Sequence, residues 1–452
     1  MELSQTNNKS LSTNFFALAI TMLILGISFG LLGALQYAIP GFLKEVFSFE
    51  KVRPLHVSSV VFWIILAAIG SVIVYLQEFG QIKIYSNKLL RIQFYLFVVS
   101  IILIISSYFL GRFGGKEYWE FPPIISIFIL LAWILFLVNF LKTIKRLKYM
   151  PVFVWMWLTG IVFFLFTFLE SYLWLLPYFK TNIVNDMTIQ WKANGSMVGS
   201  WNMLIYGSSI YLMDKISGDQ KYSNSKIAYA LFFLGLINLL FNWGHHIYTL
   251  PTHGYIKHIS YVVSMTEFII LGKIIYQWKA SLSVAKKHFH LLSYRFLAAA
   301  DVWLFLNLFL AILMSIPVLN VFTHGTHITV AHVMGTTIGI NTFLLLAFCF
   351  DIFKDKITLT NKWKSIVNTS FWITNISFLF FWCTLILIGI LKAKWQMNQT
   401  IVSFSSFMIQ LQPLFYVFFF SGFCLSIGII VITIPLVKAF KMKKVISHDF
   451  SN

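Results

Sequence analysis

The chain has 452 residues, of which 59% are hydrophobic and only 11% are charged. This composition excludes soluble, disordered, fibrous and secreted disulfide-rich proteins, because those classes carry far more polar residues or cysteine. A net charge of +19 would suit a nucleic-acid-binding protein, but the positive residues lie in short segments between long apolar runs. The sequence therefore predicts an all-α, multi-pass membrane protein that contacts membrane lipid and no nucleic acid.

The apolar runs, taken in chain order, predict twelve transmembrane helices. About 20 apolar residues cross the hydrocarbon core of a bilayer as a helix. Runs of this length lie near residues 14–39, 57–76, 89–110, 122–141, 152–177, 190–213, 226–249, 255–276, 294–317, 326–350, 365–391 and 412–438. The connections are short and contain no linker, so we expect one integral membrane domain over residues 1–452.

Lysine and arginine predict the orientation of these spans. Positive residues are retained on the cytoplasmic side of a membrane. If both termini are cytoplasmic, most of the 34 lysine and arginine residues fall on that side. Both termini are therefore predicted to be cytoplasmic.

Most of the histidines fall in the outer half of this topology. His56 opens the second span, His245 and His246 end the seventh, and His332 lies one to two turns into the tenth. Ionisable side chains within spans are costly and are usually functional. A single histidine within a membrane is explained by a hydrogen bond between helices as well as by metal binding. The adjacent pair His245 and His246, at a depth similar to that of His56 and His332, favours metal binding, and the binding of haem iron in particular.

Met334 follows His332 by two residues in the tenth span. Their side chains therefore diverge by about 200° around the helix. One helix can thus present an imidazole to one cofactor and a thioether to another. From the spacing alone, core packing is the better explanation of Met334.

The segments around these positions resemble the large, catalytic subunit of nitric oxide reductase, a member of the haem-copper oxidase superfamily. The resemblance covers nearly the whole chain. It is carried by Arg53-Pro-Leu-His56, by Trp243-Gly-His245-His246 and by residues 323–332, which read Thr-His-Gly-Thr-His-Ile-Thr-Val-Ala-His. It implies a twelve-helix bundle like subunit I of these oxidases, in a bacterial inner membrane.

The resemblance also implies a role for each matched residue. His332 is expected to ligate a high-spin haem, and His245 and His246 a non-haem iron that faces it. His56 and Met334 are expected to ligate a low-spin haem, because Met334 replaces the second histidine of a His-x-His pair and methionine is also a good haem ligand. Both haems are expected to be of b type.

Three further residues are predicted to belong to the site, which are Glu117, Glu267 and His324. Lys116-Glu117-Tyr-Trp-Glu120 resembles a family segment in which Glu117 would contribute to a calcium site. Ser264-Met-Thr-Glu267 resembles a segment whose glutamate is assigned a protonation role, so Glu267 is a candidate catalytic residue. His324 is expected to contact a haem at the outer rim.

The sixth span departs from the family pattern. It reads Asn194-Gly-Ser-Met-Val198-Gly-Ser-Trp201-Asn202, where the family has His-Leu-Trp-Val-Glu-Gly-Val-Trp-Glu. One histidine and two glutamates on one helical face thus become Asn194, Val198 and Asn202. Asn194 remains a candidate metal ligand and catalytic residue, but its amide oxygen binds iron more weakly than imidazole does, so metal binding is expected to weaken.

The favoured function is reduction of two nitric oxide molecules to nitrous oxide by a divergent reductase. The chain lacks the N-terminal region of quinol-oxidising members, so electrons are expected from a haem c subunit or another donor. Two alternatives stay open: a nitric oxide dismutase, which fits the loss of the two glutamates, and a haem protein that binds or senses nitric oxide without turnover. An oxygen-reducing oxidase is less favoured, because no tyrosine follows His245 or His246 by four residues.

Overall fold

The computed structural model describes residues 2–220, 222–266, 291–398 and 402–441. Regular structure in these residues is helical, apart from one isolated bridge between Lys116 and Trp119. The all-α prediction is confirmed. The longer helices are α1 (Glu2–Ala38), α2 (Phe49–Gly80), α3 (Asn87–Phe109), α4 (Ser126–Ile144), α5 (Val152–Glu170), α7 (Ile183–Ser217), α8 (Lys226–Phe241), α11 (Leu292–Ser315), α14 (Phe343–Ile352), α15 (Asn361–Met397) and α17 (Gln412–Lys441). Shorter helices are α6 (Pro177–Lys180), α12 (Pro317–Thr323), α13 (His327–Met334) and α16 (Phe404–Gln410).

Within the described residues, 10 helices are long and apolar enough to cross a membrane. They match ten of the twelve predicted spans. The sixth predicted span lies inside α7, which is 35 residues long but is interrupted by many polar side chains. The eighth is helical over residues 254–266 and then leaves the described part of the chain. The count of twelve and the orientation of the termini therefore stay predictions.

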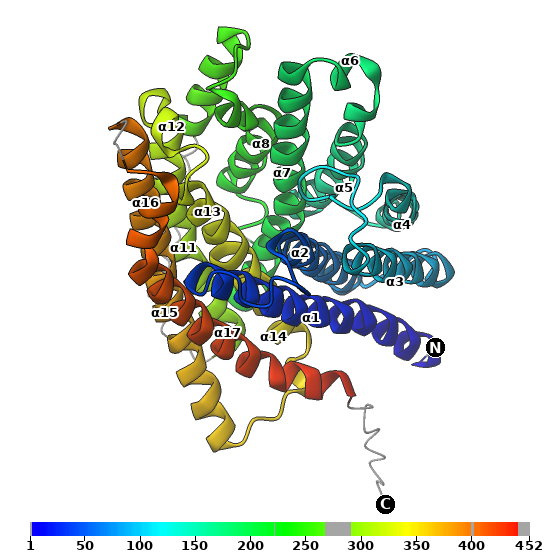
Figure 1. Ribbon diagram of the computed structural model, residues 1–452. Coiled ribbons are helices and arrows are strands. Elements are labelled where there is room, and N and C mark those ends of the chain that lie inside the picture. The colour runs from blue at the N-terminus through cyan, green and yellow to red at the C-terminus, as the bar shows by residue number, and fades with distance from the viewer. Residues whose placement is uncertain (1, 221, 267–290, 399–401, 442–452) are drawn as a thin grey trace, which may run out of the picture.

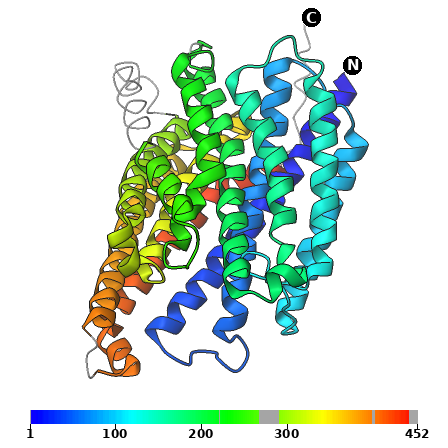
Figure 2. The ribbon, with the colours of Figure 1, turned by 90° about the horizontal axis from the view of Figure 1, so that it is seen from above.

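The helices lie side by side in one bundle (Figures 1 and 2). α1 packs along both α2 and α17, so the first and last described helices are neighbours. α7 packs against α5, and α15 packs against α17. Residues far apart in the sequence thus meet around the centre of the bundle.

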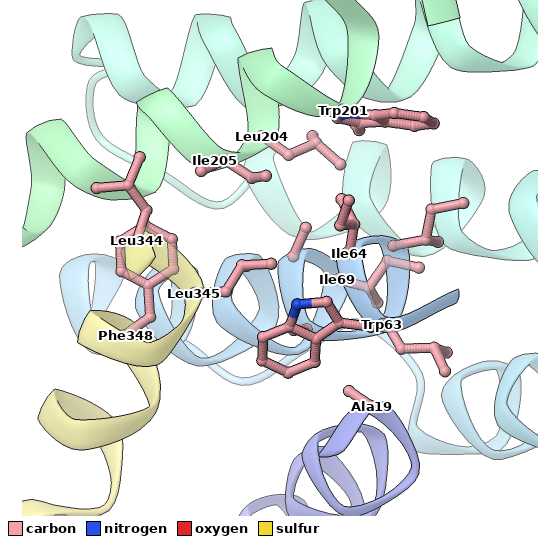
Figure 3. Packing of buried hydrophobic residues seen from close by; sticks show 14 of the residues in the cluster. Ala19, Trp63, Ile64, Ile69, Trp201, Leu204, Ile205, Leu344, Leu345 and Phe348 are labelled. Carbon is pink, nitrogen blue, oxygen red and sulfur yellow. The ribbon is translucent and has the colours of Figure 1, made fainter. Parts of the chain in front are cut away.

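Two helical segments form that centre. In α2, 83% of an apolar stretch of 18 residues is buried inside the protein. The buried share of the corresponding stretch is 72% in the segment His327–Ile352 and at most 56% in each of the other candidate spans. Figure 3 shows Trp63 and Ile64 of α2 near Leu204 of α7 and Leu345 of α14. The two segments that carry His56 and His332 are therefore surrounded mostly by protein, whereas the other candidate spans expose more of their apolar surface.

The segment His327–Ile352 changes pitch along its length. α13 is followed by the π-helix η5 (Gly335–Thr342), and α-helical geometry returns in α14. Short π-helical stretches inside α-helices are rare and occur often at functional sites. Met334 is the last residue before the π turn.

Candidate functional site

An internal cavity of about 620 Å³ lies in the half of the bundle that is predicted to face outward. Residues of α1, α2, α7, α11, α13, α15 and α17 line it, together with η3 (Asn242–Ile247) and η5. Most of its wall is apolar, but it collects nearly all of the predicted site residues. The ones that line it are His56, Glu117, Asn194, His245, His246, His332 and Met334.

Two predicted site residues remain, and of these only His324 is described by the structure. His324 lies just behind the cavity wall, with its ring centroid 5.7 Å from that of Trp191 and 6.5 Å from that of His246. Burial lowers the pKa of His324. Glu267 lies outside the described residues.

His327 lines the cavity and was not predicted to be a site residue. Its ring centroid is 5.9 Å from that of Tyr37 and 5.9 Å from that of Phe415, which belong to α1 and α17. Its Nδ1 atom is buried without a hydrogen-bond partner among the described residues. In the sequence, only its nearness to His332 marks His327 as a candidate site residue. His324 is near His332 as well, so the sequence does not indicate which of the two lines the cavity.

His56 is held in one orientation by α1. Its Nδ1 atom lies 2.7 Å from the carbonyl oxygen of Gly26. Because a carbonyl only accepts hydrogen bonds, Nδ1 carries the proton and Nε2 is the nitrogen left to bind a metal. Gly30 allows this close packing, since a Cβ there would lie 2.7 Å from the imidazole ring.

His245 and His246 project from η3, directly after α8. Their ring centroids are 4.2 Å apart, and the rings are tilted by 39°. The ring of His246 stacks on Trp191 of α7 at 4.8 Å with an interplanar angle of 8°. α7 approaches η3 closely because of Gly195, where a Cβ would lie 2.8 Å from the Cβ of Trp243.

Asn194 of α7 lines the same cavity as this histidine pair. It is 3% exposed, and its Oδ1 atom has no hydrogen-bond partner in the part of the chain that the structure describes. Among the described residues, no group of three or more His, Cys, Asp or Glu side chains could hold a metal ion. The donor set that fits a metal here is therefore two imidazoles and one amide oxygen, which suits weaker binding than three imidazoles.

His332 and Met334 enter the cavity from α13. His332 and His246 line the same cavity from α13 and η3. The Nδ1 atom of His332 is buried and finds no side-chain or backbone hydrogen-bond partner within the described ranges. Met334 packs partly against the hydrophobic core and also lines the cavity, so it is available both for packing and as a ligand.

The connection between α3 and α4 contributes Glu117 to the cavity wall on the side predicted to be outer. An ion pair between Glu120 and Arg53 ties it to α2, and Lys116 reaches Asp186 of α7 at 2.6 Å. Burial raises the pKa of Glu117, and the positive charge of Arg53 opposes this shift. Glu117 is the single acidic residue among the described residues that line the cavity.

Comparison with known proteins identifies the family. Residues 10–424 match the family model of Cytochrome C and Quinol oxidase polypeptide I. The chain is 24% identical to a nitric oxide reductase subunit of Stutzerimonas stutzeri over 260 residues, which are 53% of this chain and 53% of that protein. It is 22% identical over 381 residues to the cbb3-type cytochrome c oxidase subunit CcoN1 of the same species, covering 80% of this chain and 79% of that protein.

A solved structure of a heme-copper terminal oxidase dimer has the same fold. Its TM-score is 0.77 at 16% sequence identity, and the match covers 97% of this chain and 85% of that one. The chain spans about half the length of the nitric oxide reductase subunit that it matches. The family model, in contrast, covers most of the chain. The chain therefore belongs to the cytochrome c and quinol oxidase polypeptide I family, as a divergent haem-copper oxidase subunit I-like member.

Proposed function

We propose that this chain is the catalytic subunit of a bacterial inner-membrane oxidoreductase that reduces nitric oxide. One observation carries the proposal: imidazoles of His56, His245, His246 and His332 line a single cavity together with the thioether of Met334. Such a set, on separate helices of a membrane bundle, suits haem and a second metal better than unrelated packing roles. The reaction is 2 NO + 2 electrons + 2 protons to nitrous oxide and water.

The residues in the cavity fit the implied cofactors. His56 and Met334 would hold a low-spin b-type haem, and His332 a high-spin one. His245, His246 and Asn194 would hold a non-haem iron. When bound, these metals would pass on the electrons and supply the Lewis acidity that joining two nitric oxide molecules requires.

The chain itself positions these groups and excludes water. The hydrogen bond to the carbonyl of Gly26 fixes the ring of His56, and Trp191 stacks on the ring of His246. The mainly apolar wall excludes water, which strengthens electrostatic interactions in the cavity. Glu117 would bind calcium at the outer rim, and Glu267 would supply protons. Electrons would come from a haem c subunit or another donor.

Nitric oxide dismutation is the second candidate. The cavity is lined by Val198 and Asn202 at positions where a reductase would carry carboxylates. The conversion of 2 NO to dinitrogen and dioxygen consumes no protons, so it does not need those carboxylates. The remaining alternative, a sensor with an empty second metal site, does not need these carboxylates either, so the gas products distinguish the two.

Gas analysis of the purified protein, supplied with isotopically labelled nitric oxide, tests the proposal. We expect labelled nitrous oxide that depends on an added electron donor, and two haems per chain. Labelled dinitrogen with dioxygen in the absence of a donor would instead support dismutation. A nitric oxide spectrum without gas would support a sensor, and consumption of dioxygen alone would support an oxidase.

Exchange of Gly30 for alanine tests the low-spin haem site. The new Cβ would lie 2.7 Å from the ring of His56, so the ring has to move. We expect Gly30→Ala to lose most of the low-spin haem absorption and to keep the high-spin haem. Gly33→Ala is the matched control on the same helix, because a Cβ there meets its neighbours only at 3.5 Å or more. An unchanged low-spin spectrum in Gly30→Ala would argue against His56 as a ligand.

A further inference from the structure

α11 contacts the helix that carries His332 through two glycines. A Cβ on Gly335 would lie 2.1 Å from Oδ1 of Asn307, and one on Gly339 would lie 2.8 Å from the Cβ of Trp303. The two glycines are four residues apart, and so are the two α11 residues that face them. Pairs of small residues at this spacing allow membrane helices to approach closely. α11 is therefore pressed against the π-helical stretch directly after His332 and Met334.

Hydrogen bonds continue from this contact toward His332. Nδ2 of Asn307 donates to Oγ1 of Thr336 at 2.9 Å, and this hydroxyl donates to the carbonyl oxygen of His332 at 3.2 Å. Asn307 is 2% exposed and belongs to the cavity wall, as does Thr336. The side chain of Asn307 is thus joined, through one hydroxyl, to the backbone of the residue proposed to bind the high-spin haem.

His332 lies in the cavity wall, and its Nδ1 atom has no direct hydrogen-bond partner among the described residues. The groups around a histidine that binds metal set the orientation and the strength of that ligand. Because no acceptor holds this ring directly, its orientation depends on the backbone of His332, which Thr336 and Asn307 tie to α11.

We propose that Asn307 and Thr336 form a positioning pair for His332. The pair holds the last turn of α13 against α11 and thereby sets the angle and the strength of the bond from His332 to the high-spin haem iron. This inference rests on the proposed haem ligation by His332. Met334 projects from the other side of α13, so the low-spin haem is affected less.

The test uses the purified, haem-loaded protein. Its readouts are the iron–histidine stretching vibration of the reduced high-spin haem, by resonance Raman spectroscopy, and the midpoint potential of that haem. Thr336→Val removes the hydroxyl at nearly constant volume, and Asn307→Leu removes its amide donor. In both variants we expect a vibration of lower frequency and a higher midpoint potential, because a less firmly held backbone at His332 turns the imidazole away from the iron and makes it a weaker donor. Thr336→Ser keeps the hydroxyl and should retain the original values.

Asn375→Leu is the matched control. Asn375 accepts a hydrogen bond from the indole nitrogen of Trp303 at 3.2 Å, so its loss loosens α11 without removing the pair. A shift in this control as large as in Thr336→Val would overturn the proposal, and so would an unmoved vibration in Thr336→Val. If Asn307→Leu does not fold, the proposal is tested by comparing the vibration and the midpoint potential of Thr336→Val with those of Thr336→Ser. Absence of the vibration in the unsubstituted protein would refute haem ligation by His332 instead.

Discussion

Replacing His332 with alanine is expected to remove the high-spin haem and to leave the low-spin haem bound. His56 and Met334, the proposed ligands of the low-spin haem, are retained in this variant, and His56 is held independently by Gly26 of α1. Haem content should therefore fall from two per chain to one, and nitric oxide turnover should be lost. Total haem content and the optical spectrum of the reduced protein measure both effects.

The control for this experiment is His258→Ala. His258 is exposed and does not belong to the described wall of the cavity, so both haems should remain. Retention of both haems in His332→Ala would disprove the assignment of His332. Loss of both haems, together with a lower thermal stability, would show that His332 is required for folding and not only for one cofactor.

Replacing Asn194 with histidine is expected to strengthen the second metal site. The substitution adds a third imidazole beside His245 and His246, and the cavity next to Asn194 offers space for the larger ring. Affinity should rise by at least about tenfold, because even changes behind the direct ligands alter metal affinity by about 10- to 100-fold. Metal content per haem, measured by mass spectrometry after dialysis against a chelator, reports the change.

Asn202→His is the matched control, since Asn202 lies on the same helix and lines the same cavity two turns further along. It should not increase metal content if the site is at Asn194. Equal metal content and equal rate in Asn194→His and the unsubstituted protein would mean that Asn194 does not occupy the position of the family's histidine ligand.

The helical class and the family could be predicted from the sequence because both depend on local patterns. Apolar runs of membrane length predicted ten of the helices as candidate spans, and the segments around His56, His245 and His332 carried the resemblance that the family model confirms. The span predicted at 190–213 lies in α7, which has many polar side chains, among them Asn194 and Asn202 in the cavity wall. Polar residues that line a cavity make this helix less apolar than the ten candidate spans.

Other features depend on contacts between distant segments. The π turn after Met334 could not be predicted, because its glycines fit an ordinary helix equally well until α11 is packed against them. The same limit applies to the histidines before His332. His327 lines the cavity while His324 lies behind it, and this difference depends on how α13 begins relative to α1 and α17.

The π-helical stretch also bears on how the central helix tolerates a change in length. A π turn holds one residue more than an α turn. Deleting one residue between 335 and 342 would therefore restore ordinary helix without rotating the inner half of the segment relative to His332. The same deletion within α14 would turn every later side chain by about 100°. The helix thus carries a spare residue at the boundary between its ligand-bearing half and its densely packed half.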